Sequence, residues 1–152
     1  MSRFVRVAAR AGSYFLSSYS RTTDYLWIAV GTPGRLDESV SDEVLGLSIR
    51  DALDASQDGV ARPDDLRGLL KPLLEVAGMR SEAAFYAGAR VMAVERDGAT
   101  VSVVPERWDG RSRRSPLFLP MEATMCDAPS SGDLGAAVRE ALNRAVPVPS
   151  SA

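Results

Sequence analysis

Apolar side chains recur at helical spacing in two similar stretches, one before the middle of the chain and one near its C-terminus. LGLSIRDAL spans Leu45–Leu53, and LGAAVREAL spans Leu134–Leu142, 89 residues further on. In each copy the apolar residues stand at i, i+4, i+7 and i+8, which places them on one face of a helix. Ser41 and Ser130 precede the two stretches by four residues and are suited to cap the helix N-termini. The pattern predicts two amphipathic helices that cover one core.

Shorter apolar runs that favour extended structure precede the first of these helices. Phe4–Val7 and Tyr14–Tyr19 are expected as strands because aromatic residues and Val suit a pleated surface. Tyr25–Val30 is expected as a buried strand that ends at Gly31 and Pro33. The polar residues between the second and third runs predict a loop, so these two runs are expected to form a hairpin.

The middle of the chain predicts three helices. The first covers about 42–55, and the second is indicated by leucines at helical spacing in Asp64–Gly78. Pro72 is expected to break or kink that second helix, and Gly78 is expected to cap its C-terminus. A third, short helix is expected at 82–87, beginning after Ser81.

The clearest hairpin signal lies in Ala89–Pro105. Asp97-Gly98 is a favoured two-residue turn, and centring the turn on it makes Val94 face Val101 and Met92 face Val103. Leu117–Met125 is expected to be extended and interrupted at Pro120, a last helix covers 130–145, and about 146–152 is expected to form a frayed tail.

These elements give the order β-β-α-α-α-β-β-β-α. The predicted fold class is α+β, with a mainly antiparallel sheet formed by hairpins and covered by amphipathic helices, in a single domain over residues 1–152. The repeat extends weakly upstream, since Trp27–Val30 aligns with Pro116–Leu119. This suggests a pseudo-symmetric pair of sheet-plus-helix units.

Charge is spread unevenly over an otherwise average composition. The 152 residues carry a net charge of −2, but residues 24–65 contain ten acids and only three bases. An acidic block of this kind can attract a basic partner and repels phosphates. No apolar run is long enough to span a membrane, and the single cysteine, Cys126, excludes an internal disulfide.

Few catalytic arrangements are compatible with this sequence. The absence of histidine removes Ser-His and Cys-His pairs as well as histidine metal sites, and no phosphate-binding or nucleophile-elbow motif occurs. No cofactor is expected. A small enzyme that uses carboxylates stays open as an alternative.

A second alternative is a calcium-binding module at Asp54–Asp65. Asp54, Ser56 and Asp58 match positions 1, 3 and 5 of a twelve-residue calcium loop, and Asp65 matches position 12. A third alternative is the basic loop Arg107–Arg114, which offers arginines to phosphates and Trp108 for base stacking. The acidic balance of the chain argues against nucleic acid as a partner.

Several stretches, in order, resemble the immunity proteins of bacterial contact-dependent growth inhibition systems (CdiI type). They are SYSRTTDYLWIAVG at Ser18–Gly31, SDEVLGLSIRDALDAS at Ser41–Ser56, KPLLEVAGMRSEAAF at Lys71–Phe85, the hairpin around Asp97-Gly98 ending at Pro105, and SSGDLGAAVREAL at Ser130–Leu142. Together they cover most of the chain from about residue 14 onward.

The resemblance implies a cytoplasmic inhibitor without catalysis. Such a protein binds the C-terminal toxin domain delivered by a neighbouring cell, often a nuclease, and blocks its active site. The acidic block is the expected contact surface for a basic nuclease cleft. From charge alone, we expect toxin binding by Asp37, Glu38, Asp42, Glu43, Asp54 and Asp58.

Overall fold

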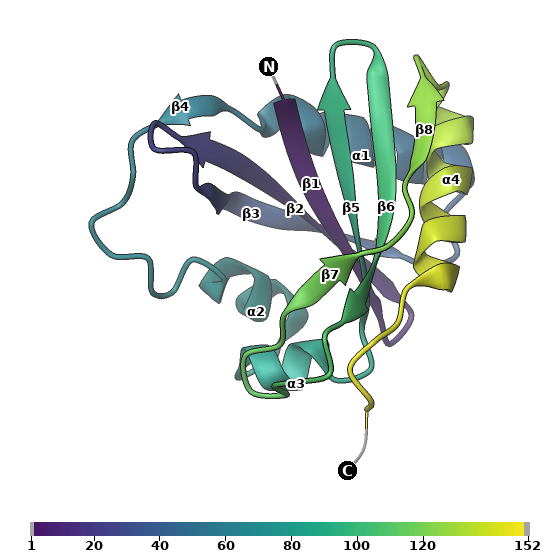
Figure 1. Cartoon of the computed structure of the whole chain (residues 1–152). Coiled ribbons are helices and arrows are strands. Elements are labelled where there is room, and N and C mark those ends of the chain that lie inside the picture. Colours follow the sequence, from purple (N-terminus) through teal and green to yellow (C-terminus); the bar gives the residue numbers. More distant parts are fainter. Residues whose placement is uncertain (1, 151–152) are drawn as a thin grey trace.

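The computed structural model describes residues 2–150, in which eight strands form one sheet (Figure 1). The strands are β1 (Ser2–Arg10), β2 (Ser13–Thr22), β3 (Trp27–Asp37), β4 (Asp58–Val60), β5 (Arg90–Asp97), β6 (Thr100–Trp108), β7 (Phe118–Pro120) and β8 (Thr124–Asp127). The main order is β3-β2-β1-β5-β6-β7, with β8 also paired to β6 and β4 paired to β2. Every pairing is antiparallel except that of β4 with β2. The predicted α+β class with a mainly antiparallel sheet is confirmed.

Helices cover the two faces of the sheet unequally. The helices are α1 (Asp42–Ala55), α2 (Lys71–Ala77), α3 (Glu82–Tyr86) and α4 (Ser131–Arg144). The long helices α1 and α4 pack on one face, with Leu45, Ile49, Leu134 and Val138 fully buried against strand residues such as Val5. The short helices α2 and α3 cover only the lower end of the other face, where Phe85 is buried (Figure 1). Among the described residues, no helix is long and apolar enough to cross a membrane.

The predicted helix caps are confirmed. The hydroxyl oxygens of Ser41 and Ser130 accept hydrogen bonds from the backbone N–H groups of Val44 and Asp133, each at 3.1 Å. Ser81 caps α3 in the same way, and Gly78 ends α2 in the left-handed conformation that glycine adopts without strain.

The register predicted for the β5–β6 hairpin is wrong by two residues. The turn residues are Gly98 and Ala99, so Val94 pairs with Val103 and Met92 pairs with Pro105. Gly98 has a positive φ at the first turn position, which suits a type II′ turn rather than the expected Asp-Gly turn. Because a register shift of two residues keeps every side chain on the same face of the sheet, the apolar face was still predicted correctly.

The third strand is longer than predicted. It begins at Trp27 and pairs with β2 as the expected hairpin, but it passes through Gly31 and Pro33 and ends at Asp37. A register shift opposite Leu16–Ser18 accommodates the extra residues, and Gly31 takes a positive φ there. Pro33 is tolerated because β3 is an edge strand, where one missing N–H donor leaves no gap in the sheet.

Two further predictions need correction. The expected helix over Asp64–Gly78 is only α2, because Pro72 lies in its first turn and begins the helix instead of kinking it. The tail expected to fray from 146 onward is instead held by bridges to β6 and to the residue that follows α3. Val146 bridges to Arg107, and Val148 bridges to Ala87 and is buried. Residues 151 and 152 lie outside the described part of the chain.

The chain consists of two similarly arranged halves. β1, β2, β3 and α1 are followed about 89 residues later by β5, β6, β7 and α4, and the strand order is the same read from either edge. β1 pairs with β5 at the centre, where Val5 lies opposite Val94. The pseudo-symmetry suggested by the repeated helices therefore extends to the six strands of the main order.

The two repeated helices touch through their glycines. A Cβ atom built on Gly46 would lie 1.8 Å from the carbonyl oxygen of Ser131, and one built on Gly135 would lie 1.9 Å from that of Asp42. Each helix also sends an arginine to the start of the other. Arg50 donates to the Pro129 carbonyl, and Arg139 donates to the carbonyl at the equivalent position, Val40.

Candidate functional site

The acidic residues predicted to bind a partner separate into groups. Asp37, Glu38, Asp42 and Glu43 gather where β3 turns into α1, and Asp54 lies a helix length away, about 18 Å from Asp42 at 1.5 Å per residue. The hydroxyl and backbone N–H of Ser39 both donate to Asp37 and lower the pKa of that carboxyl. The structure therefore brings four of the six together.

Three of the six acids have arginine partners within the chain. Asp42 pairs with Arg139, Asp54 pairs with Arg96 at 2.6 Å, and Asp58 accepts two hydrogen bonds from Arg21 at 2.9 and 2.7 Å. The bonds from Arg21 lower the pKa of Asp58. These internal pairs reduce the negative field of the acidic block, which is strongest at Asp37, Glu38 and Glu43.

The four residues of the possible calcium loop do not converge. Ser56 is fully buried and its hydroxyl donates to the Tyr19 carbonyl while accepting from the Phe4 N–H. Asp65 bonds Arg67, and Asp54 and Asp58 bond the arginines named above. Over residues 2–150, no group of three or more acidic or cysteine side chains could hold a metal ion.

The basic loop after β6 folds onto its own tryptophan. The indole N–H of Trp108 donates to the Ser112 carbonyl at 2.9 Å, and the Arg113 guanidinium lies 5.7 Å from the ring centre. The ring that was considered for base stacking is therefore already in contact with an arginine of the loop.

An outward stripe along α1 adds apolar side chains to the acidic ones. Val44 and Leu47 are 43% and 48% exposed, and Glu43 and Asp51 are exposed beside them. Residues at i, i+4 and i+8 share a helix face, so Glu43, Leu47 and Asp51 form one row. Sequence reasoning missed Val44, Leu47 and Asp51, although the spacing opposite the buried stripe was visible. We call Glu43, Val44, Leu47 and Asp51 the α1 outer face.

The sheet face that packs against α2 and α3 also carries aromatic and arginine side chains beyond the part that these helices cover. The Phe4 ring meets the Tyr19 ring edge-on and the Trp27 ring at a tilt, with ring centres 5.3 and 5.4 Å apart. Arg21 lies over Trp27 and over Tyr25, which is 75% exposed. Such residues are enriched at protein interfaces, so this side is a second surface suited to a protein partner.

A buried ion pair lies next to these rings. The Arg6 guanidinium on β1 is 3.3 Å from the Glu106 carboxylate on β6, and the second carboxylate oxygen has no hydrogen-bond partner among the described residues. Burial raises the pKa of Glu106, and Arg6 opposes that rise.

Comparison with solved structures places this architecture among known folds. A chain of the CdiA-CT/CdiI toxin and immunity complex from Yersinia pseudotuberculosis superposes with a TM-score of 0.76, covering 95% of this chain and 98% of that one. This protein has that fold.

The sequence identity to that Yersinia chain is only 17%. A protein of unknown function from Neisseria meningitidis also superposes with a TM-score of 0.76, at 14% identity, covering 95% of this chain and 96% of that one. No protein-family model matches the sequence, and no curated protein matches it. At these identities the likeness establishes the fold.

Proposed function

We propose that this protein is the immunity protein of a contact-dependent growth inhibition system, and that it binds and neutralises a cognate toxin domain. The observation that carries the proposal is the fold shared with a chain of a toxin and immunity complex, over nearly the full length of both chains. The ordered set of sequence stretches from Ser18 to Leu142 supports the same conclusion independently.

In this proposal the protein acts in the cytoplasm as an inhibitor and carries out no reaction itself. It covers the active site of the C-terminal domain of the toxin, which we propose to be a nuclease. Nucleases that bind phosphates present basic clefts, so an acidic surface on the inhibitor complements them and accelerates encounter.

We assign the contact to the N-terminal end of α1 and to the α1 outer face. Asp37, Glu38 and Glu43 supply negative charge, while Val44 and Leu47 supply apolar area at the centre of the patch. This combination of an apolar centre and a charged rim is the usual composition of a protein interface. Asp42, Asp54 and Asp58 contribute less to steering because arginines of the same chain are bound to them.

Co-expression in bacteria tests the proposal. The toxin is the C-terminal domain of a large secreted protein encoded immediately upstream, and it is induced with this protein or with an empty vector. Cells are expected to survive only in the first case, and the two proteins are expected to co-elute on size exclusion. Growth arrest in both cases, with no complex, would overturn the proposal. A toxin domain of unrelated sequence is the specificity control.

A further inference from the structure

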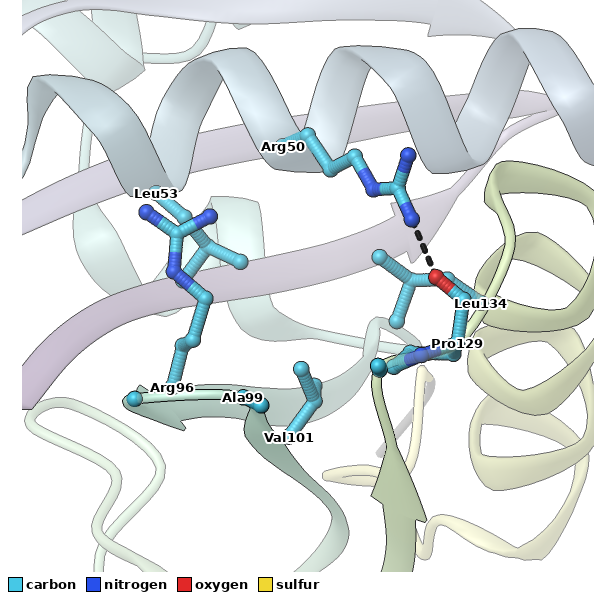
Figure 2. A pocket seen from close by; sticks show the side chains of 9 residues that line it. Arg50, Leu53, Arg96, Ala99, Val101, Pro129 and Leu134 are labelled. Atoms are coloured by element: carbon cyan, nitrogen blue, oxygen red, sulfur yellow. Dashed lines mark hydrogen bonds between the residues drawn. The ribbon is translucent and has the colours of Figure 1, made fainter.

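A cavity of about 190 Å³ lies between α1, the β5–β6 turn and the start of α4 (Figure 2). This volume is far more than the ~10–15 Å³ that one water molecule needs, so it offers room for one side chain or a small molecule. Leu53, Val101 and Leu134 give it apolar walls, and two arginines, Arg50 and Arg96, line it. Figure 2 shows Arg50 extending from α1 and Arg96 extending from the end of β5, on either side of the gap.

The pseudo-symmetry of the chain shows what Arg50 lacks. Its counterpart in the other half is Arg139, which forms an ion pair with Asp42 at the first position of α1. The residue equivalent to Asp42 is Ser131, whose hydroxyl accepts a hydrogen bond from Arg50 at 2.9 Å. Within residues 2–150, no carboxylate lies within ion-pair distance of Arg50. One half of the molecule therefore neutralises its arginine, and the other half does not.

The same comparison explains why a cavity exists. The β1–β2 and β5–β6 hairpins both have two-residue turns, so Tyr14 and Val101 occupy equivalent positions just after them. Tyr14 is buried, its hydroxyl accepts from Arg139 at 3.3 Å, and its ring lies 5.8 Å from the Arg139 guanidinium. Val101 is too small to reach Arg50 in this way. The cavity is the space that an aromatic side chain fills in the first half.

A second arginine lines this side, but it already has a partner. Arg96 occupies the place of Ala9 in the hairpin register, and its guanidinium donates to the exposed carboxylate of Asp54 at 2.6 Å. Asp97 and Asp127 stand at the adjoining strand ends, and the residues that line the cavity themselves include no acid. A ligand that supplies both a carboxylate and apolar volume would restore here what Asp42 and Tyr14 provide in the other half.

We propose that the Arg50 cavity binds a carboxylate group on a short apolar stem, and that the partner protein supplies it as an Asp or Glu side chain. That the partner supplies the carboxylate rests on the proposed immunity function, whereas binding of a carboxylate in the cavity does not. Arg50 contacts the carboxylate, and Leu53, Val101 and Leu134 contact the stem.

Nuclear magnetic resonance titration with sodium butyrate tests carboxylate binding in the cavity without any toxin. Saturable shifts are expected at the backbone amides of Gly98, Ala99 and Ala128, and butyramide, which is neutral, is expected to cause none. Ser131→Asp places a carboxylate where Asp42 stands in the other half, and it should weaken butyrate binding at least tenfold.

Gly132→Asp is the matched control, because it adds the same charge one residue further along α4. A Cβ atom built on Gly132 has no heavy atom within 4 Å and its φ is not positive, so a side chain is accommodated there, and Gly132 is not among the residues that line the cavity. This variant should bind butyrate as the wild type does. Equal loss in both variants, shifts elsewhere in the protein, or no saturable shift would overturn the carboxylate site.

The source of the carboxylate is tested by the same two variants in the toxin complex. Ser131→Asp is expected to raise the dissociation constant of the toxin domain at least tenfold, and Gly132→Asp is expected to leave it unchanged. If Ser131→Asp loses butyrate binding but keeps its affinity for the toxin domain, the proposal that the partner supplies the carboxylate is overturned. A toxin domain that binds neither variant nor the wild type would contradict the immunity function and leave the butyrate result standing.

Discussion

At the scale of single residues, Glu106 shows how an ionisable side chain becomes buried in this sheet. Its charge partner, Arg6, lies on β1 and reaches Glu106 on β6 across β5, where Ala93 is the residue opposite Arg6. A buried ion pair recovers its desolvation cost only when the remaining hydrogen-bonding groups are satisfied. One Glu106 oxygen is not satisfied within the described chain, which agrees with the raised pKa of this carboxyl.

Glu106→Gln is therefore expected to change how stability depends on pH. A carboxyl whose pKa is raised on folding contributes stability below its unfolded pKa of about 4.3, and loses that contribution as pH rises through the folded pKa. Glutamine does not titrate, so the free energy of unfolding of Glu106→Gln relative to wild type should increase from about pH 4 upward. Urea denaturation at several pH values measures it, and a difference independent of pH would contradict the expectation.

Ser56 illustrates a residue whose sequence context suggested one role and whose structure gives another. It accepts the Phe4 N–H at 3.1 Å and donates to the Tyr19 carbonyl, so it joins the end of α1 to β1 and β2. Ser56→Ala leaves both backbone groups without this partner and should cost about 1–3 kcal/mol of unfolding free energy. Thermal melts of wild type with calcium or with a chelator should coincide. A melting temperature that rises with calcium would instead support the calcium-loop interpretation.

At the scale of elements, the glycines of the repeated helices decide how α1 and α4 meet. The stretch LGxx[IV]RxAL predicted the buried stripes correctly, but the two helices do not only cover a sheet. Gly46 and Gly135 allow the two backbones to touch, because a Cβ atom at either position would lie only 1.8 or 1.9 Å from a carbonyl oxygen of the other helix. The shared glycine was visible in both copies, and only the structure shows the carbonyl that each one faces.

Gly46→Ala and Gly135→Ala should each destabilise the fold by about 3 kcal/mol, because the added methyl group forces the helices apart. Gly132→Ala, in the same helix as Gly135 and with open space around it, should instead stabilise the protein by up to about 1 kcal/mol. Guanidinium denaturation of the three variants measures the differences. Equal effects at Gly132 and Gly135 would show that helix propensity, rather than contact, governs these positions.

The strands were predictable to the extent that their signals were local. Alternation and the two hairpins placed β2, β5 and β6, whereas the extension of β3 through Pro33 depends on its position at the edge of the sheet. The tail at Val146–Val148 could not be placed from its prolines, because its partners Arg107 and Ala87 are distant in sequence. The Arg50 cavity depends on comparing Val101 with Tyr14, which requires the register of both hairpins.

At the scale of the whole molecule, charge is divided between the two sides of the sheet. The acids expected to meet a partner lie mainly on the side of α1, while Asp58 is bound to Arg21 beside the rings of the other side. The sequence showed the acidic block, but it could not show which acids are already paired, because Arg139, Arg96 and Arg21 are 37 or more residues away from them.

Reversing charge on the α1 side should slow association with the toxin domain. Glu38→Arg combined with Glu43→Arg is expected to lower the association rate about tenfold at low salt, and the difference should shrink at high salt as screening shortens the range of the field. Glu75→Arg, on α2 across the sheet, is the control and should change little. Stopped-flow mixing at several ionic strengths measures the rates. A salt-independent effect, or an equal effect at Glu75, would move the contact surface elsewhere.

The crossing of α1 and α4 also bears on when the protein becomes active in a cell. Because Arg139 donates to the Val40 carbonyl and Gly135 lies against the Asp42 carbonyl, packing around the start of α1 is complete only once α4 has been made and has docked. At about 5–20 residues per second, the 89 residues that separate the start of α4 at Ser131 from the start of α1 at Asp42 take roughly 4–18 s to synthesise. Through that interval a nascent chain has no finished α1 surface, and newly made molecules acquire it only after the last helix has been translated.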